Sequence, residues 1–197
     1  MTSFGNAGLI ATYATIPTAT PDIFKRIPKM LLDPSGPLSL RWSYLPRLSP
    51  WLISLVRNST PEQIRNNALV KSILLNRAWD DYKPLIASAS AEDLFYAGGM
   101  MRVFRTDAAF EAMKAREMDL MDLTERRYEL LSTDEIRQME PGLEPIFRHA
   151  IFSTDTRNIR NPGRLTERFA ADFKVRGGTI SQEKVTSLDG TAEGSWR

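Results

Sequence analysis

The chain has 197 residues, of which 42% are hydrophobic and 25% charged, so it can bury a core as one domain or two small ones. Its 26 basic and 24 acidic residues leave a net charge of +2, which is too weak for a nucleic-acid-binding surface. The absence of cysteine excludes disulfides, thiolate metal sites, a cysteine nucleophile and thioether attachment of a cofactor.

The N-terminal part of the chain offers little regular structure. Residues 1–21 are rich in Gly, Ala, Thr and Pro, which is typical of irregular chain with short extended pieces. Five prolines interrupt the apolar residues between Asp22 and Arg57, so we expect only short helices there, at 22–32 and 50–57. A segment like 1–21 normally needs another surface to lie against.

The clearest helix signal begins at Thr60. Thr60 supplies the N-cap, Pro61 takes the first helical position, and Gln63 completes a capping box. We predict a long helix over about 61–83, which Pro84 kinks or ends, and one extra turn beyond the proline is left open. Its expected core-facing stripe consists of apolar residues at helical spacing, namely Ile64, Ala68, Ile73, Leu74, Ala78, Trp79, Tyr82 and Leu85.

Strand signals follow the long helix. The runs DLFYA and MMRVFRT flank Gly98-Gly99, and two strand-like runs separated by two glycines predict a hairpin. A second helix is predicted after Thr106, where apolar residues again recur at helical spacing.

Short elements alternate in the next part of the chain. YELL and AIFS are predicted strands. Between them, Ser132 and Glu135 form a capping box for a short helix that ends at Glu140, before a proline.

The C-terminal region is predicted to add one more helix. Asn161 and Pro162 open it, Gly177-Gly178 end it, and TISQEKVTSL after it favours a strand or a hairpin arm. The predicted fold class is therefore α+β, with helices and antiparallel hairpins mixed.

The block SFGNAGLI near the N-terminus is the most informative piece of the sequence. Its small residues let main-chain N–H groups approach a ligand closely, as loops that hold phosphates or flavins require, and Asn6 offers both a donor and an acceptor. Taken alone, the block has an alternative interpretation, a mobile N-terminal arm that contains Gly and Ala by chance.

Four blocks together carry a resemblance to a known family. SFGNAGLI, GGMMRVFRTDAAFE, YELLSTDEIRQMEPGL and NPGRLTERFAADFKVRGGTI, the last followed by EKV, stand in the order and approximate spacing found in flavoproteins of the D-amino-acid dehydrogenase and D-amino-acid oxidase family. The chain resembles the central portion of such an enzyme along nearly its whole length. The resemblance implies an FAD-holding dinucleotide-binding domain, a substrate or cap domain with an antiparallel sheet and helices, and oxidation of D-amino acids by hydride transfer to the flavin.

The resemblance also implies roles for particular residues. Along the flavin it places five residues of the N-terminal block, Ser3, Asn6, Ala7, Gly8 and Leu9. The main chain of Val185 is similar in position to the residue that meets the adenine end. A substrate carboxylate in this family is met by an arginine and often a tyrosine, and the candidates here are Tyr96, Arg102 and Arg105 on the predicted hairpin. The alternative is that these three are outward-facing strand residues.

One feature of the family has no counterpart in this sequence. Such enzymes open with a strand, a GxGxxG turn and a helix that receives the pyrophosphate, and no GxGxxG occurs here. We therefore expect a flavin-contacting loop of an incomplete FAD domain at 1–21, a substrate or cap domain at 22–150, and a return to the incomplete FAD domain at 151–197. The hypothesis is a fragment or subunit, inactive alone and completed by another chain or a second copy. The alternative is a non-catalytic remnant that only binds or self-associates.

Other polar residues give weaker signals. His149 is the only histidine, and a lone histidine is more often a surface or satisfied buried residue than a catalyst. Asp155, Arg157 and Arg160 precede a helix, where a solvated turn is favoured over a site. The sequence shows no pattern of metal ligands, so no metal site is expected.

The segment 37–58 is both aromatic and basic. It contains Trp42, Tyr44, Trp51 and three arginines, a composition suited to a boundary between water and lipid. Two interpretations remain open, cap-domain core packed on the long helix or a peripheral contact at the inner face of a membrane. The chain lacks the basic start of a secretory signal and any apolar run of about 20 residues, so we expect a cytoplasmic protein that does not cross a bilayer.

Overall fold

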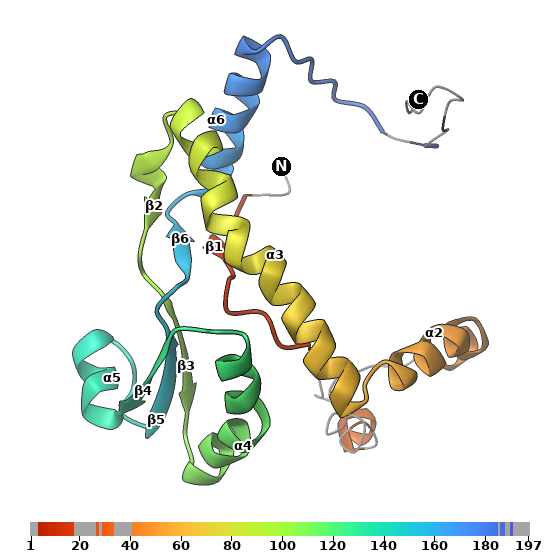
Figure 1. The fold of residues 1–197 in the computed structure, drawn as a ribbon, viewed down its shortest axis with the longest axis vertical. Helices are drawn as coiled ribbons and strands as arrows, with labels where there is room; N and C mark the ends of the chain where they lie inside the picture. The colour runs from red at the N-terminus through yellow and green to blue at the C-terminus, as the bar shows by residue number, and fades with distance from the viewer. Residues whose placement is uncertain are drawn as a thin grey trace.

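The computed structural model describes residues 4–17, 27, 29–33, 41–184, 186–187 and 190. Within these ranges the chain forms helices and two small antiparallel sheets, in agreement with the α+β prediction (Figure 1). Ser3 and Val185 lie outside the described residues, and of the helix expected at 22–32 only 27 and 29–32 are described within a helix.

Two three-stranded sheets form the centre of the molecule. The first, sheet A, has the order β1-β6-β2, with strands Leu9–Ile10, Arg157–Ile159 and Phe95–Tyr96. The second, sheet B, has the order β3-β5-β4, with strands Met100–Phe104, His149–Ser153 and Tyr128–Ser132. Every pairing is antiparallel. The chain passes between the two sheets twice, from β2 to β3 and from β5 to β6.

Helices cover both sheets. The longest, α3 (Pro61–Ser88), runs diagonally across the molecule, and α6 (Pro162–Val175) packs beside its C-terminal part (Figure 1). Sheet B is covered by α4 (Asp107–Leu123) and α5 (Thr133–Met139), while α2 (Leu45–Arg57) projects to one side. Two short 3₁₀ helices, η1 (Trp42–Tyr44) and η2 (Glu92–Leu94), precede α2 and β2.

Buried apolar clusters hold the helices on the sheets. One joins α3 and α6 beside sheet A and includes Ile86 and Leu165. In sheet B, consecutive residues of β5 point to opposite faces, as strand geometry requires. Ile151 packs with α4 on one face, and Ala150 packs with α5 on the other. Both helices that cover sheet B, α4 and α5, therefore pack against residues of β5.

The predicted starts of α3, α4, α5 and α6 are confirmed, and each of these helices has a capping residue. Thr60 caps α3 and Thr106 caps α4, each accepting a hydrogen bond from a backbone N–H in the first turn. Ser132 and Glu135 form the complete capping box at the start of α5, and Asn161 caps α6. These motifs act within one helical turn, so the rest of the fold does not alter them.

The hairpin predicted around Gly98-Gly99 is wrong. β2 and β3 belong to different sheets, and the two glycines carry the chain from sheet A to sheet B. Gly99 has a φ of +66°, and a Cβ there would lie 2.3 Å from the ring of Phe152. Glycine is therefore needed because an aromatic ring crosses the turn, and not because the chain reverses.

The apolar stripe predicted for α3 is only partly correct. Ile64 and Ala68 are buried as expected, but Ile73 and Leu74 are 64% and 70% exposed. The buried face continues through Ser72 instead. Each residue of a helix turns about 100° from the one before, so Ile73 and Leu74 point away from that face.

The structure also shows how the chain continues after Pro84 and after α6. Pro84 does not end α3, which runs on to Ser88 and so includes the extra turn that the sequence left open. Ile86 just beyond the proline is buried in the cluster shared with α6, and this packing offsets the hydrogen bond that a proline removes. The strand expected in TISQEKVTSL is not formed at 179–184 or 186–187, where the chain is exposed and pairs with neither sheet.

Trp79 offers a test of which helix face is buried. It packs against the cluster between α3 and α6, and its ring centroid lies 5.7 Å from that of Phe95. We expect Trp79→Ala to lower the free energy of unfolding by about 2 to 3 kcal/mol, because packed aromatic area is lost. Trp51→Ala is the control, since Trp51 is 58% exposed, and should cost less than about 1 kcal/mol. Denaturant melts measure both, and equal losses would contradict this assignment of the core.

Candidate functional site

The segment predicted to contact a flavin is held at the edge of sheet A. Gly8 N donates to Oδ1 of Asn6 at 2.8 Å, and Ile159 N donates to the carbonyl of Gly8 at 2.6 Å. Gly8 has a φ of +60°, and a Cβ there would lie 2.4 Å from the Ile159 carbonyl oxygen, so only glycine fits. Asn6 and Ala7 are exposed, which leaves the turn open to a ligand.

Strand β6 joins this segment to one of the predicted substrate residues. Leu9 of β1 and Tyr96 of β2 both pair with Asn158 of β6. Neighbouring strands are about 4.8 Å apart, so the backbones at Leu9 and Tyr96 are separated by about 10 Å. Of the residues assigned to the cofactor, Ser3 and Val185 lie outside the described part of the chain.

A pocket opens beside Tyr96, between α3, η2, β2 and β6. Its volume is about 450 Å³, within the range of small-molecule sites. The lining is mostly apolar, and the side chains that give it its chemistry are Trp79, Phe95, Tyr96, Lys83, Glu92 and Arg157. Aromatic walls with a few charged groups suit a small molecule that carries an ionised group.

Two arginines of this region lie over aromatic rings. The guanidinium of Arg157 is 5.4 Å from the ring centroid of Trp79, and that of Arg160 is 4.7 Å from the ring of Tyr96. Neither forms an ion pair with any residue that the structure describes. The sequence favoured a solvated turn for both, but Arg157 lies in strand β6. That strand has only three residues, too few for a periodic pattern to be seen in the sequence.

Arg102 and Arg105 lie away from the pocket. Arg102 on β3 pairs with Glu117 of α4 at 2.6 Å, and Arg105 lies over the ring of Phe147 at 5.8 Å. Neither is among the described residues that line the pocket. The structure therefore does not bring Tyr96, Arg102 and Arg105 together, because the turn after β2 leads into β3, which contains Arg102 and ends one residue before Arg105.

The groups with shifted pKa values lie outside the pocket, and the largest shift is that of Tyr128, whose pKa a hydrogen bond to Asp122 raises to about 12. A hydrogen bond of 2.8 Å with His149 lowers the pKa of Asp107, and hydrogen bonds from Arg168 lower the pKa of Asp93. The ring of His149 also stacks on Phe110, with centroids 4.5 Å apart. His149 thus has a structural partner on each side. No group of His, Asp and Glu side chains that could hold a metal occurs among the described residues.

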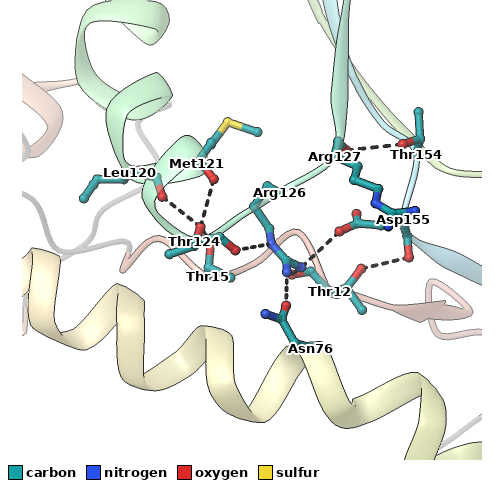
Figure 2. A network of polar contacts seen from close by, with 10 residues as sticks. All are labelled: Thr12, Thr15, Asn76, Leu120, Met121, Thr124, Arg126, Arg127, Thr154 and Asp155. Atoms are coloured by element: carbon teal, nitrogen blue, oxygen red, sulfur yellow. Dashed lines mark hydrogen bonds and ion pairs between the residues drawn. The ribbon is translucent and has the colours of Figure 1, made fainter.

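A buried arginine fixes the N-terminal segment from the other side (Figure 2). Arg126, in the turn between α4 and β4, is 9% exposed. Its Nη1 donates to the carbonyl of Thr12 at 2.8 Å and lies 3.0 Å from Oδ2 of Asp155. Its Nη2 donates to Asn76 of α3, and its Nε donates to the carbonyl of Thr124 at 3.2 Å. One side chain thus connects the N-terminal segment, α3, the end of α4 and the turn between β5 and β6.

Threonines complete this network. Thr12 Oγ1 donates to the carbonyl of Asp155 at 3.1 Å, and the buried hydroxyls of Thr15 and Thr124 are 3.2 Å apart (Figure 2). The segment is therefore held at Thr12 and at Thr15 as well as at β1. Sequence reasoning missed this network, because nothing local distinguishes Arg126 from its exposed neighbour Arg127.

Comparison with known proteins identifies the family of this chain. The whole chain, residues 1–197, matches the model of the DAO family, described as FAD dependent oxidoreductase, and the chain belongs to that family. It is 32% identical over 190 residues to a D-amino-acid oxidase of Bradyrhizobium diazoefficiens, with 94% of this chain and 44% of the relative covered. It is 33% identical over 145 residues to a D-amino acid dehydrogenase of Phenylobacterium zucineum, with 72% and 33% covered.

A solved structure is also similar, the glycine oxidase from Bacillus cereus ATCC 14579. The TM-score is 0.49 at 19% identity, with 68% of this chain and 35% of that chain covered. The chain spans less than half the length of the curated relatives named above.

The buried arginine can be tested by substitution. We expect Arg126→Met to lower the free energy of unfolding by about 3 kcal/mol, because Asp155 and the Thr12 carbonyl lose their partner in a buried place. Arg127→Met, one residue on and exposed, should change it by less than about 0.5 kcal/mol. Urea melts measure both, and limited proteolysis should cut residues 4–17 faster in the Arg126 variant. Equal behaviour of the two variants would show that the network does not hold the segment.

Proposed function

We propose that this chain forms part of an FAD-dependent oxidoreductase that oxidises D-amino acids. Family membership and the names of the relatives, D-amino-acid oxidase and D-amino acid dehydrogenase, support this reaction. The observation that carries the proposal is sheet A, in which β6 lies between the flavin segment and the strand that bears Tyr96. A flavin bound along Asn6–Leu9 would thus lie two strand spacings, about 10 Å, from Tyr96 at the pocket.

The residues present fit the flavin end of FAD. Asn6 and Ala7 of the turn are exposed, and the buried Gly8 behind them is fixed by the hydrogen bond from Ile159. No GxGxxG occurs in the sequence, so the pyrophosphate and ribose contacts of a dinucleotide site have to come from elsewhere. When bound, FAD supplies the acceptor for the hydride of the amine-bearing carbon.

In this proposal the chain's own residues orient the substrate. Tyr96 and Arg157 bind its carboxylate, since a planar guanidinium grips a carboxylate with two parallel hydrogen bonds. Trp79 holds the guanidinium of Arg157 in place and, with Phe95, supplies an apolar wall for the substrate side chain. Arg102 and Arg105, engaged in sheet B, are left out of the proposed contacts.

The proposal keeps a flavin-contacting segment at 1–21, a substrate or cap domain at 22–150 and a return to the FAD domain at 151–197. Sheet A takes β1 from the first part, β2 from the second and β6 from the third. Further chain or a second copy completes the FAD site. The alternative is a non-catalytic domain that only binds or self-associates, and the exposed apolar side chains of α2 and α3 favour it.

The cofactor proposal makes a quantitative prediction. Hydrogen bonds of about 1 kcal/mol each at Asn6–Leu9 barely exceed the cost of ordering that turn and the ligand. We therefore expect this chain alone to bind FAD no tighter than about 100 μM and to show no D-alanine-dependent dye reduction. Gly8→Ala should abolish the weak binding. Gly142→Ala should not, because a Cβ at Gly142 meets nothing within 4 Å.

Titration of FAD by flavin fluorescence separates the outcomes. Weak binding that only Gly8→Ala removes supports the proposed site. A chain that does not bind FAD even at about 1 mM supports the non-catalytic alternative. Micromolar binding or clear turnover would contradict the claim that the site is incomplete.

A second proposed role is peripheral contact with a membrane through α2. No residue of α2 is buried, and Trp51, Ile53 and Val56 are more than half exposed, which favours contact with a membrane over a place in the core. Between Asp33 and Glu62 the sequence has three arginines and no acidic residue, so anionic lipid attracts this segment. No helix in the described part of the chain is long and apolar enough to span a membrane.

Co-sedimentation with vesicles tests this role. We expect binding to vesicles that contain phosphatidylglycerol, weaker binding at high salt, and a loss of roughly fivefold or more in Trp51→Ser, because an interfacial aromatic anchor is removed. Val175→Ser, 87% exposed on α6, is the control and should bind as the parent does. Equal binding to uncharged vesicles, or no effect of Trp51→Ser, would contradict the proposal.

A further inference from the structure

The outward face of α3 is apolar over one helical turn. One side of the helix carries its buried residues, Ile64, Ala68, Ser72 and Ile86. On the opposite side Val70 is 60% exposed, Ile73 64% and Leu74 70%. Three neighbouring aliphatic side chains on an exposed helix face are typical of a surface that another element covers.

A line of six side chains runs along this face, and its two central members, Val70 and Ile73, are apolar. Side chains at alternating intervals of three and four residues form a seam through the patch, consisting of Gln63, Asn66, Val70, Ile73, Arg77 and Asp80. At about 100° per residue, these positions stay opposite the buried side of the helix. A seam with this spacing is the surface through which two helices pack side by side.

We propose that this seam docks against the same seam of a second copy, with the two α3 helices antiparallel. Val70 of each copy then faces Ile73 of the other, and the contact is symmetric. The two exposed β-branched residues of the seam are covered by the same pair of contacts.

The charges on the seam determine the direction of the second helix. In a parallel, in-register pair, Arg77 faces Arg77 and Asp80 faces Asp80, and these like-charge contacts oppose docking. In the antiparallel pair, Arg77 faces Asn66 of the second copy and Asp80 faces Gln63. No like charges then meet along the seam.

The flanks of the antiparallel pair are complementary as well. At each end Glu62 lies beside Lys83 of the second copy, an opposite-charge contact next to the seam. Lys83 already bonds Asp80 of its own chain at 2.7 Å, which holds its ammonium near this edge. Only two apolar layers are buried, so we expect a weak dimer with a dissociation constant of about 10 to 100 μM.

Single-cysteine variants test the geometry, because the chain contains no cysteine. Chains with Val70→Cys and mass-tagged chains with Ile73→Cys are mixed and oxidised mildly. Antiparallel docking brings these two positions together, so the mixed disulfide should exceed either homodimer by roughly fivefold. Homodimers of both variants in equal or larger amounts would indicate parallel docking and overturn the proposal.

Sedimentation equilibrium tests the surface independently of direction. Ile73→Asp should weaken self-association at least about tenfold, because it brings a carboxylate into an apolar contact. Val175→Asp, at an exposed site on α6, should leave it unchanged, and circular dichroism melts check that both variants fold. A chain that stays monomeric at about 200 μM would overturn the proposal and indicate that another part of a longer protein covers this face. A dimer that Ile73→Asp does not weaken would overturn it too and indicate that the interface lies elsewhere.

Discussion

The guanidinium of Arg126 is buried where four segments of the chain meet (Figure 2). Taking such a charge out of water is costly, and it is stable there because Asp155 and the carbonyl of Thr12 satisfy it. Besides Arg126, the N-terminal segment is held by the hydroxyls of Thr12 and Thr15 and by the two-residue strand β1, whose pairing is marginal by itself. The position of the turn at Asn6–Gly8 therefore depends on the side chain of Arg126, which comes from the turn between α4 and β4.

Features of this fold that depend on neighbouring residues could be predicted from the sequence. Thr60, Ser132 and Asn161 begin helices because a cap needs only the residues of the first turn. Features that depend on distant residues could not. Gly98-Gly99 matches a hairpin signal, but the ring of Phe152 determines what the two glycines do. The buried face of α3 likewise depends on sheet A and α6, which periodicity alone does not specify.

In the candidate site, too, one part depends on neighbouring residues and the rest depends on distant ones. The turn at Asn6 and Gly8 is predictable because the two residues bond to each other. Tyr96 and Arg157 share a pocket because β2 pairs with β6, and no local signal in the sequence indicates that pairing. The buried network is equally hidden, since two adjacent arginines have the same side chain and the fold buries only Arg126.

Sheet A also has a consequence for how the protein folds. Its strands lie at residues 9–10, 95–96 and 157–159, so long loops must close before Leu9 and Tyr96 can pair with Asn158. Sheet B is built from residues much closer in sequence, and its pairings need shorter loops. We expect sheet B and its helices to form first and the turn at Asn6–Gly8 to become ordered last. A ligand that binds only the ordered turn stabilises the product of this last folding step. Ligand binding and completion of the fold are therefore coupled equilibria.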